Sequence, residues 1–153
     1  MKTRGFTLIE ALIYMGLLTI LLGGFLSSAY ALFETNDRNQ ASAILIEETN
    51  FIVEKIDRLL DETKSVVTPV ADASDTTLAV EAYDGSVRNA ALQDGNIVLD
   101  AHPLNNSNSE ISDLVFIHHV LPEYVEASFT VSTKTSNGMP LSRHASTTHS
   151  IGI

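Results

Sequence analysis

The sequence predicts an α+β fold in which a long N-terminal helix, with a membrane half and an amphipathic half, packs on an antiparallel β-sheet. Three observations predict it: a charge-free apolar run at residues 11–33, helical spacing of apolar residues at 41–66, and short alternating segments after Pro69. A helix with one apolar stripe and a sheet with one apolar face satisfy each other by packing. At 153 residues the chain suits one modest domain plus an anchor.

The apolar run is 23 residues long and rich in Leu and Ile. As a helix with a rise of about 1.5 Å per residue, it would cross a hydrocarbon layer roughly 30 Å thick. Lys2 and Arg4 precede it and no comparable basic cluster follows closely. This asymmetry favours a single pass through the inner (cytoplasmic) membrane, with a cytoplasmic N-terminus and an extracytoplasmic remainder. Membrane lipid is therefore an expected partner of this segment.

Apolar residues recur at helical spacing between positions 41 and 66, with acidic residues largely between them, which predicts an amphipathic helix of about seven turns. No proline occurs before Pro69 and nothing at 34–40 forces a break, so we expect one continuous helix. Its weak point is Gly23-Gly24, because a glycine costs roughly 1 kcal/mol relative to alanine. The apolar stripe is expected to pack in the core, and its members are Ile44, Leu45, Phe51, Ile52, Ile56, Leu59 and Leu60.

Beyond Pro69 the pattern changes to short strands separated by turn signals. Asp84-Gly85 and Asp94-Gly95 are hairpin signals, and Pro122-Glu123 separates a later strand pair. Residues 102–113 are rich in Asn and Ser and are expected to form an irregular, contact-making surface loop. The expected strands are 77–83, 87–92, 97–99, 114–121 and 125–133, with an edge strand in the tail at 141–153.

The charge distribution disfavours a nucleic-acid partner. The formal net charge is -10, and all but one of the acidic residues lie after Phe33, so the soluble part would repel phosphate backbones. The chain has no cysteine, which excludes disulfides, thiolate nucleophiles and Cys-based metal sites.

The most informative residues are the first ten. Lys2 and Arg4 are followed by GFTLIE at residues 5–10, which runs directly into the apolar segment. A glycine before a scissile bond offers an unhindered backbone to a protease, and the two basic residues would hold that bond at the cytoplasmic surface. Glu10 is the unusual member, because a carboxylate at the centre of a bilayer costs about 2.5–3.5 kcal/mol. It therefore needs a partner.

This N-terminus resembles the cleavage and methylation signature of type IV prepilins. The resemblance implies that a prepilin peptidase cuts between Gly5 and Phe6 and methylates the new amino group of Phe6. Glu10 then becomes the fifth residue of the mature chain, and in a filament of staggered helices it could pair with the Phe6 amine of a neighbouring subunit, which would set the register of assembly. The implied domains are a leader at 1–5, a transmembrane and polymerisation helix at 6–33, and a soluble pilin-like α+β domain at 34–153.

The resemblance also implies partners and a role. The partners are the prepilin peptidase, other pilins or pseudopilins, and an inner-membrane assembly platform with its ATPase. Major pilins often carry a proline in the membrane helix and a cysteine pair near the C-terminus, and this chain has neither. The run at 114–117 followed by 125–131 looks similar to J-type or W-type minor pseudopilins and pilins, whereas Glu10 argues against the K-type tip subunit. The expected function is thus a minor pilin or pseudopilin of a type IV pilus, competence pilus or type II secretion pseudopilus.

Three other readings remain open at this stage. The chain could be a non-polymerising, membrane-tethered extracytoplasmic binding domain that captures a ligand with its sheet and the loop at 102–113. It could be a secreted protein cleaved before Leu32, because Ala29-Tyr30-Ala31 fits a small-x-small pattern, or an uncleaved signal anchor.

No cofactor, metal or catalytic site is expected. Adjacent His118 and His119 would point to opposite faces of a strand, which disfavours joint chelation. The remaining histidines, and the acids Asp72, Asp75 and Asp84, lack the spacing of a metal-binding loop. No G-x-S-x-G elbow is present, so an enzyme is not expected. The remaining histidines are His102, His144 and His149.

Overall fold

The computed structural model describes residues 7–151. The chain divides into two compact units, one ending at Asn39 and the other beginning at Gln40. A single α-helix, α1 (Leu8–Asp61), includes residues of both units, so the prediction of one continuous helix is confirmed and Gly23-Gly24 does not interrupt it. The α+β class is confirmed as well.

Helix α1 ends earlier than the sequence predicted. It stops at Asp61, and residues assigned to its last turn form strand β1 (Thr63–Thr68) instead. The Thr63 hydroxyl donates to the carbonyl of Leu59 at 2.8 Å, which satisfies one of the last helical carbonyls. Four of the six residues that follow are β-branched and favour strand over helix.

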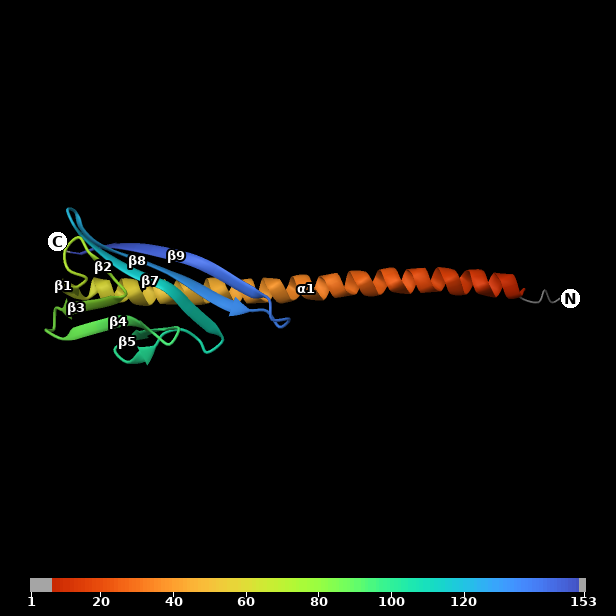
Figure 1. The fold of residues 1–153 in the computed structure, drawn as a ribbon, viewed down its shortest axis with the longest axis horizontal. Coiled ribbons are helices and arrows are strands. Elements are labelled where there is room, and N and C mark those ends of the chain that lie inside the picture. The colour runs from red at the N-terminus through yellow and green to blue at the C-terminus, as the bar shows by residue number, and fades with distance from the viewer. Residues whose placement is uncertain (1–6, 152–153) are drawn as a thin grey trace. The chain divides into compact units, whose positions relative to one another are not determined.

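The strands form two antiparallel sheets, so the prediction of one sheet was wrong. The first has the order β1-β3-β4-β5-β6 and the second β2-β7-β8-β9. Figure 1 shows β7, β8 and β9 side by side in the second sheet, and β3, β4 and β5 in the first. The bounds are β2 (Ser74–Asp75), β3 (Thr77–Ala82), β4 (Val87–Gln93), β5 (Asn96–Leu99), β6 (His102–Pro103), β7 (Ser109–Val120), β8 (Glu123–Lys134) and β9 (Pro140–Ser150).

The irregular loop is also shorter than predicted. Strands β6 and β7 occupy most of residues 102–113, which leaves 104–108 as the link between these two strands. Alternating burial over Ser109 to Ile111 marks the start of β7, but its Ser and Glu residues gave a loop-like composition. A bulge between Ser112 and Val115, with Asp113 at φ 55°, interrupts the alternation. The predicted edge strand is confirmed by β9, which pairs with β8 at one side of its sheet.

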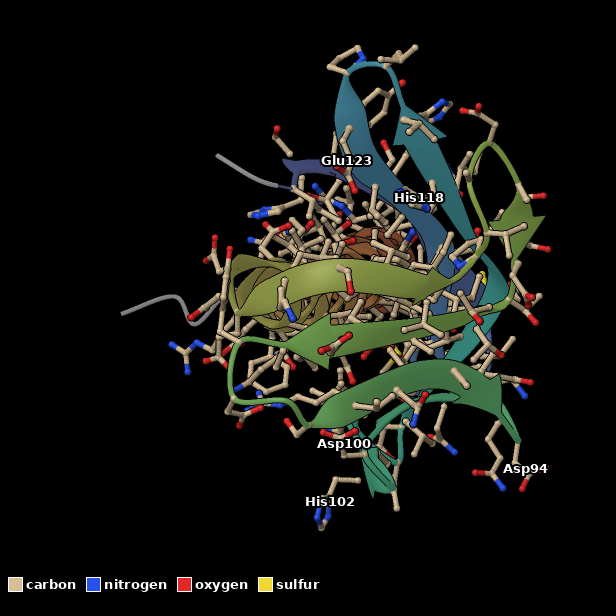
Figure 2. The ribbon with its side chains drawn as sticks, turned by 90° about the vertical axis from the view of Figure 1, so that its left-hand side faces the viewer. Asp94, Asp100, His102, His118 and Glu123 are labelled. Carbon is tan, nitrogen blue, oxygen red and sulfur yellow. The ribbon has the colours of Figure 1, made fainter. Side chains whose placement is uncertain are left out.

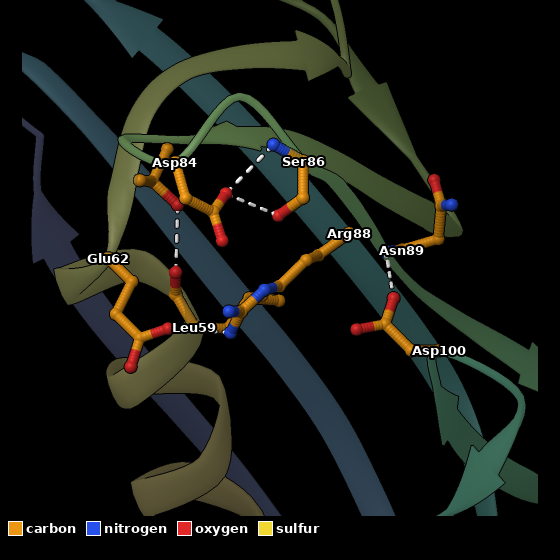
Figure 3. Close-up of polar contacts among 8 residues, drawn as sticks. Leu59, Glu62, Asp84, Ser86, Arg88, Asn89 and Asp100 are labelled. Atoms are coloured by element: carbon orange, nitrogen blue, oxygen red, sulfur yellow. Dashed lines mark hydrogen bonds and ion pairs between the residues drawn. The ribbon is translucent and has the colours of Figure 1, made fainter.

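The hairpin turns lie where the sequence placed them. Gly85 and Gly95 have φ of +83° and +74°, which a side chain would strain. The Asp84 carboxylate accepts hydrogen bonds from the Ser86 amide at 2.8 Å and the Ser86 hydroxyl at 2.5 Å (Figure 3). These bonds lower the pKa of Asp84 below its ordinary value, because they favour the charged carboxylate.

The core of the second unit joins one stripe of α1 to the inner faces of both sheets. Leu45, Ile52, Ile56, Leu59 and Leu60 are buried on the helix and contact buried residues of the strands. Two predicted members of this stripe are not in the core. The strand members of the buried cluster are Leu78, Val80, Ala90, Ile97, Ile111, Leu114, Phe116, Val125, Ala127, Phe129 and Val131, together with Ile151 after β9.

The two exceptions are Ile44 and Phe51, which are 48% and 44% exposed. The predicted stripe included too many residues, because the helical spacing of apolar residues does not show how much of the helix the sheets can cover. An apolar surface of α1 is therefore left uncovered within the second unit.

Candidate processing and assembly site

The predicted cleavage residues lie outside the described part of the chain. Lys2, Arg4, Gly5 and Phe6 all precede Thr7, so the structure does not test their roles. At Thr7 the backbone carbonyl accepts hydrogen bonds from the amides of Glu10 at 3.1 Å and Ala11 at 3.2 Å. Helix α1 begins at Leu8, the third residue after the predicted scissile bond.

Glu10 lies in the first turn of α1 and is the one charged residue between Leu8 and Phe33 in the sequence. Its side chain is partly exposed, and the Tyr14 hydroxyl donates to its Oε1 at 3.5 Å from one turn further along the helix. A hydrogen bond of that length is weak, and no residue between positions 7 and 151 forms an ion pair with this carboxylate. The carboxylate can therefore accept a cation from another molecule.

The surface around Glu10 is apolar on all sides of the helix. Helix α1 is long and apolar enough to cross a membrane, and no residue of its apolar stretch is buried. The exposed large side chains include Leu8, Ile9, Leu12, Ile13, Met15, Leu17, Leu18, Ile20, Leu21, Leu22, Phe25, Leu26, Leu32 and Phe33. A helix that is apolar all round requires lipid or other helices around it.

The histidines do not converge. His118 is buried on β7, where its Nδ1 donates to the Pro69 carbonyl at 3.1 Å, whereas neighbouring His119 stacks on Tyr124 with ring centroids 4.3 Å apart. Figure 2 places His118 near Glu123, and His102 far from them beside Asp100. Among residues 7–151 no group of three or more His, Asp or Glu side chains could hold a metal ion. Asp84, one of the acids without metal-loop spacing, instead orders a turn through its hydrogen bonds with Ser86.

The second unit contains a groove, and the sequence predicted only one of its walls as a contact surface. It lies between residues 41–51 of α1 and residues 104–110, which overlap the segment predicted to make contacts. The side chain that joins its two walls is Glu48, one of the acidic residues that lie between the apolar positions of the helix. Its Oε1 accepts hydrogen bonds from the Asn106 amide and from the Ser109 hydroxyl, the latter at 2.6 Å. No local signal reveals these contacts, because the partners are about sixty residues away.

The comparisons with known proteins bear on the N-terminus. Residues 1–26 match the family model described as the prokaryotic N-terminal methylation motif. No curated protein and no solved structure matches the chain. The match covers GFTLIE and much of the apolar helix, which are the features that carried the resemblance.

Proposed function

We propose that this chain serves as a minor subunit of a pilus or pseudopilus. The starting point is its N-terminal methylation motif, which indicates the family of type IV pilins and pseudopilins. A prepilin peptidase removes residues 1–5 and methylates Phe6. The mature chain then leaves the membrane and joins a filament through the apolar part of α1. Its role is structural, with no catalysis of its own.

Glu10 is the observation that carries this proposal. A lone carboxylate on an apolar helix is costly in a membrane, and within the described residues its side chain makes one weak hydrogen bond. Cleavage before Phe6 would create an ammonium at the same end of the helix. When helices of neighbouring subunits are staggered, the Phe6 amine of one subunit lies near Glu10 of the next, and the pair neutralises both charges in an apolar bundle.

Orientation and assembly follow from the same features. Lys2 and Arg4 keep the N-terminus cytoplasmic, so the unit beginning at Gln40 is extracytoplasmic. Before assembly the apolar segment lies in the lipid of the inner membrane. The sequence contains no P-loop, so the force for extraction comes from the ATPase of an assembly platform. The absence of a cysteine pair and of a proline in residues 8–33 favours a minor subunit over a major one. The similarity of residues 114–117 and 125–131 to J-type or W-type subunits favours that type.

Cell fractionation tests the proposal. In native cells with an active prepilin peptidase, we expect the chain in the fraction of sheared or purified filaments, together with the major subunit. In cells that lack the peptidase, it should remain entirely in the membrane fraction. A chain that stays in the membrane in both strains, while the major subunit forms filaments, would favour the membrane-tethered binding domain instead.

A further inference from the structure

The groove has walls from three parts of the second unit and a volume of about 1100 Å³. One wall is α1 from Ala41 to Phe51, another is the segment from Leu104 to Glu110, and the last residues of β8 and Pro140 also line the groove. All of these residues follow Asn39. Open grooves of this size suit an elongated ligand such as an extended peptide.

The groove is preformed, because hydrogen bonds fix the 104–110 wall. Asn105 is buried, accepts the Ile97 amide at 3.0 Å and donates to the Ser109 carbonyl at 3.0 Å. Glu48 ties the same wall to α1 through Asn106 and Ser109. A ligand would therefore bind without first ordering this segment, which reduces the entropic cost of binding.

The helical wall is apolar and open to solvent. Ile44 and Phe51, the two exposed members of the predicted apolar stripe, both line the groove, and partly buried Leu104 faces them from the other wall. An apolar strip flanked by polar residues is typical of a recognition surface. One face of the Phe51 ring already holds a cation, since the Lys55 ammonium lies 5.2 Å from its centroid.

The charges around the groove are mostly negative. Glu47, Glu48 and Glu110 line it together with the cation Lys134, and Lys55 lies beside it over the Phe51 ring. Glu47 and Glu110 are exposed, so they can pair with an incoming cation, whereas the Glu48 carboxylate is engaged by the wall. The groove therefore attracts a positively charged ligand with apolar side chains.

We propose that this groove binds an extended cationic segment of another polypeptide, with an apolar side chain against Ile44 and Phe51 and with lysine or arginine beside Glu47 and Glu110. A second copy of this chain is the poorer occupant, because its soluble part is acidic and its residues 11–33 carry no charge. The proposal goes beyond filament assembly and does not depend on it. It gives the domain a recognition surface for a basic partner.

Peptide binding to the full chain in zwitterionic nanodiscs tests the proposal, with empty nanodiscs as the blank. The probe is a short fluorescent peptide of alternating lysine and leucine, followed by anisotropy. We expect Glu47→Gln and Glu110→Gln each to weaken binding about threefold and together about tenfold, and added salt to weaken it further. Phe51→Ser should weaken it about tenfold at any salt concentration.

Glu54→Gln is the matched control, because Glu54 lies two helical turns beyond Glu47 on nearly the same side of α1 but outside the groove. It should leave affinity unchanged. Equal weakening by Glu54→Gln would show that only the overall charge attracts the peptide and would overturn the proposal. Equal affinity for a glutamate-leucine peptide would overturn it too, as would self-association of the chain that Phe51→Ser abolishes, because a second copy would then be the occupant.

Discussion

Glu10→Ala yields a chain that is cleaved and methylated normally but is absent from filaments. The leader and the residues around the scissile bond are unchanged, so the peptidase still has its substrate. In the filament, however, the Phe6 ammonium of a neighbouring subunit loses its partner in an apolar bundle. Removal of one member of a buried ion pair costs about 3–5 kcal/mol, so the filament fraction should fall roughly a hundredfold or more. Immunoblots of filament and membrane fractions measure this.

Glu34→Ala is the control for this variant. Glu34 belongs to the same unit and the same helix, but it follows the apolar segment instead of lying within it. We expect its loss to leave both cleavage and incorporation close to those of the unaltered chain. Normal incorporation of Glu10→Ala would contradict the pairing role, and an uncleaved Glu10→Ala chain would move the role of this residue from assembly to processing.

Phe129→Ala destabilises the second unit by about 3–5 kcal/mol. Phe129 lies in the middle of β8, is 0% exposed and belongs to the cluster that joins α1 to both sheets. Its truncation removes buried apolar contacts and leaves a cavity that the paired strands on either side prevent from closing. Denaturant unfolding of the full chain in detergent, followed by circular dichroism, gives the free-energy difference.

Phe51→Ala is the matched control, since it makes the same chemical change at a ring that is 44% exposed. We expect a loss of at most about 1.5 kcal/mol, because roughly half of the ring already contacts solvent. Equal losses for the two variants would show that the core is not where the structure places it. The same measurement confirms that groove variants at this position remain folded.

The sequence predicted the elements whose cause is local. The uncharged run and the absence of proline before Pro69 predicted a helix without a break, and α1 from Leu8 to Asp61 confirms it. Aspartate followed by glycine predicted the turns at 85 and 95, where φ is positive. The edge strand predicted in the tail at 141–153 is found as β9.

Features that depend on distant contacts were not predictable in the same way. Alternation identifies strands but not their neighbours, so the separation into two sheets was missed; β7 pairs with β2 and β8, not with the nearer β6. The end of α1 was placed too late because Val66 continues the helical spacing, although pairing of β1 with β3 stabilises the extended form.

The two candidate sites also differ in whether they depend on neighbouring residues or on distant contacts. The N-terminal site is a contiguous motif, so its residues could be named from the sequence, and the family match covers them. The groove depends on Glu48 meeting Asn106 and Ser109 from across the fold. The composition of the segment at 102–113 indicated a contact surface, but neither its acidic lining nor the exposure of Phe51 could be read from it.

The mass of the native N-terminal peptide tests the central claim most directly. The chain would be purified from its own cells and the peptide identified by tandem mass spectrometry. If it is a processed filament subunit, the peptide begins at Phe6 and carries one methyl group on its amine. A peptide that begins at Met1 would identify a permanent membrane tether, one that begins at Leu32 would identify a secreted protein, and either would contradict assembly through Glu10.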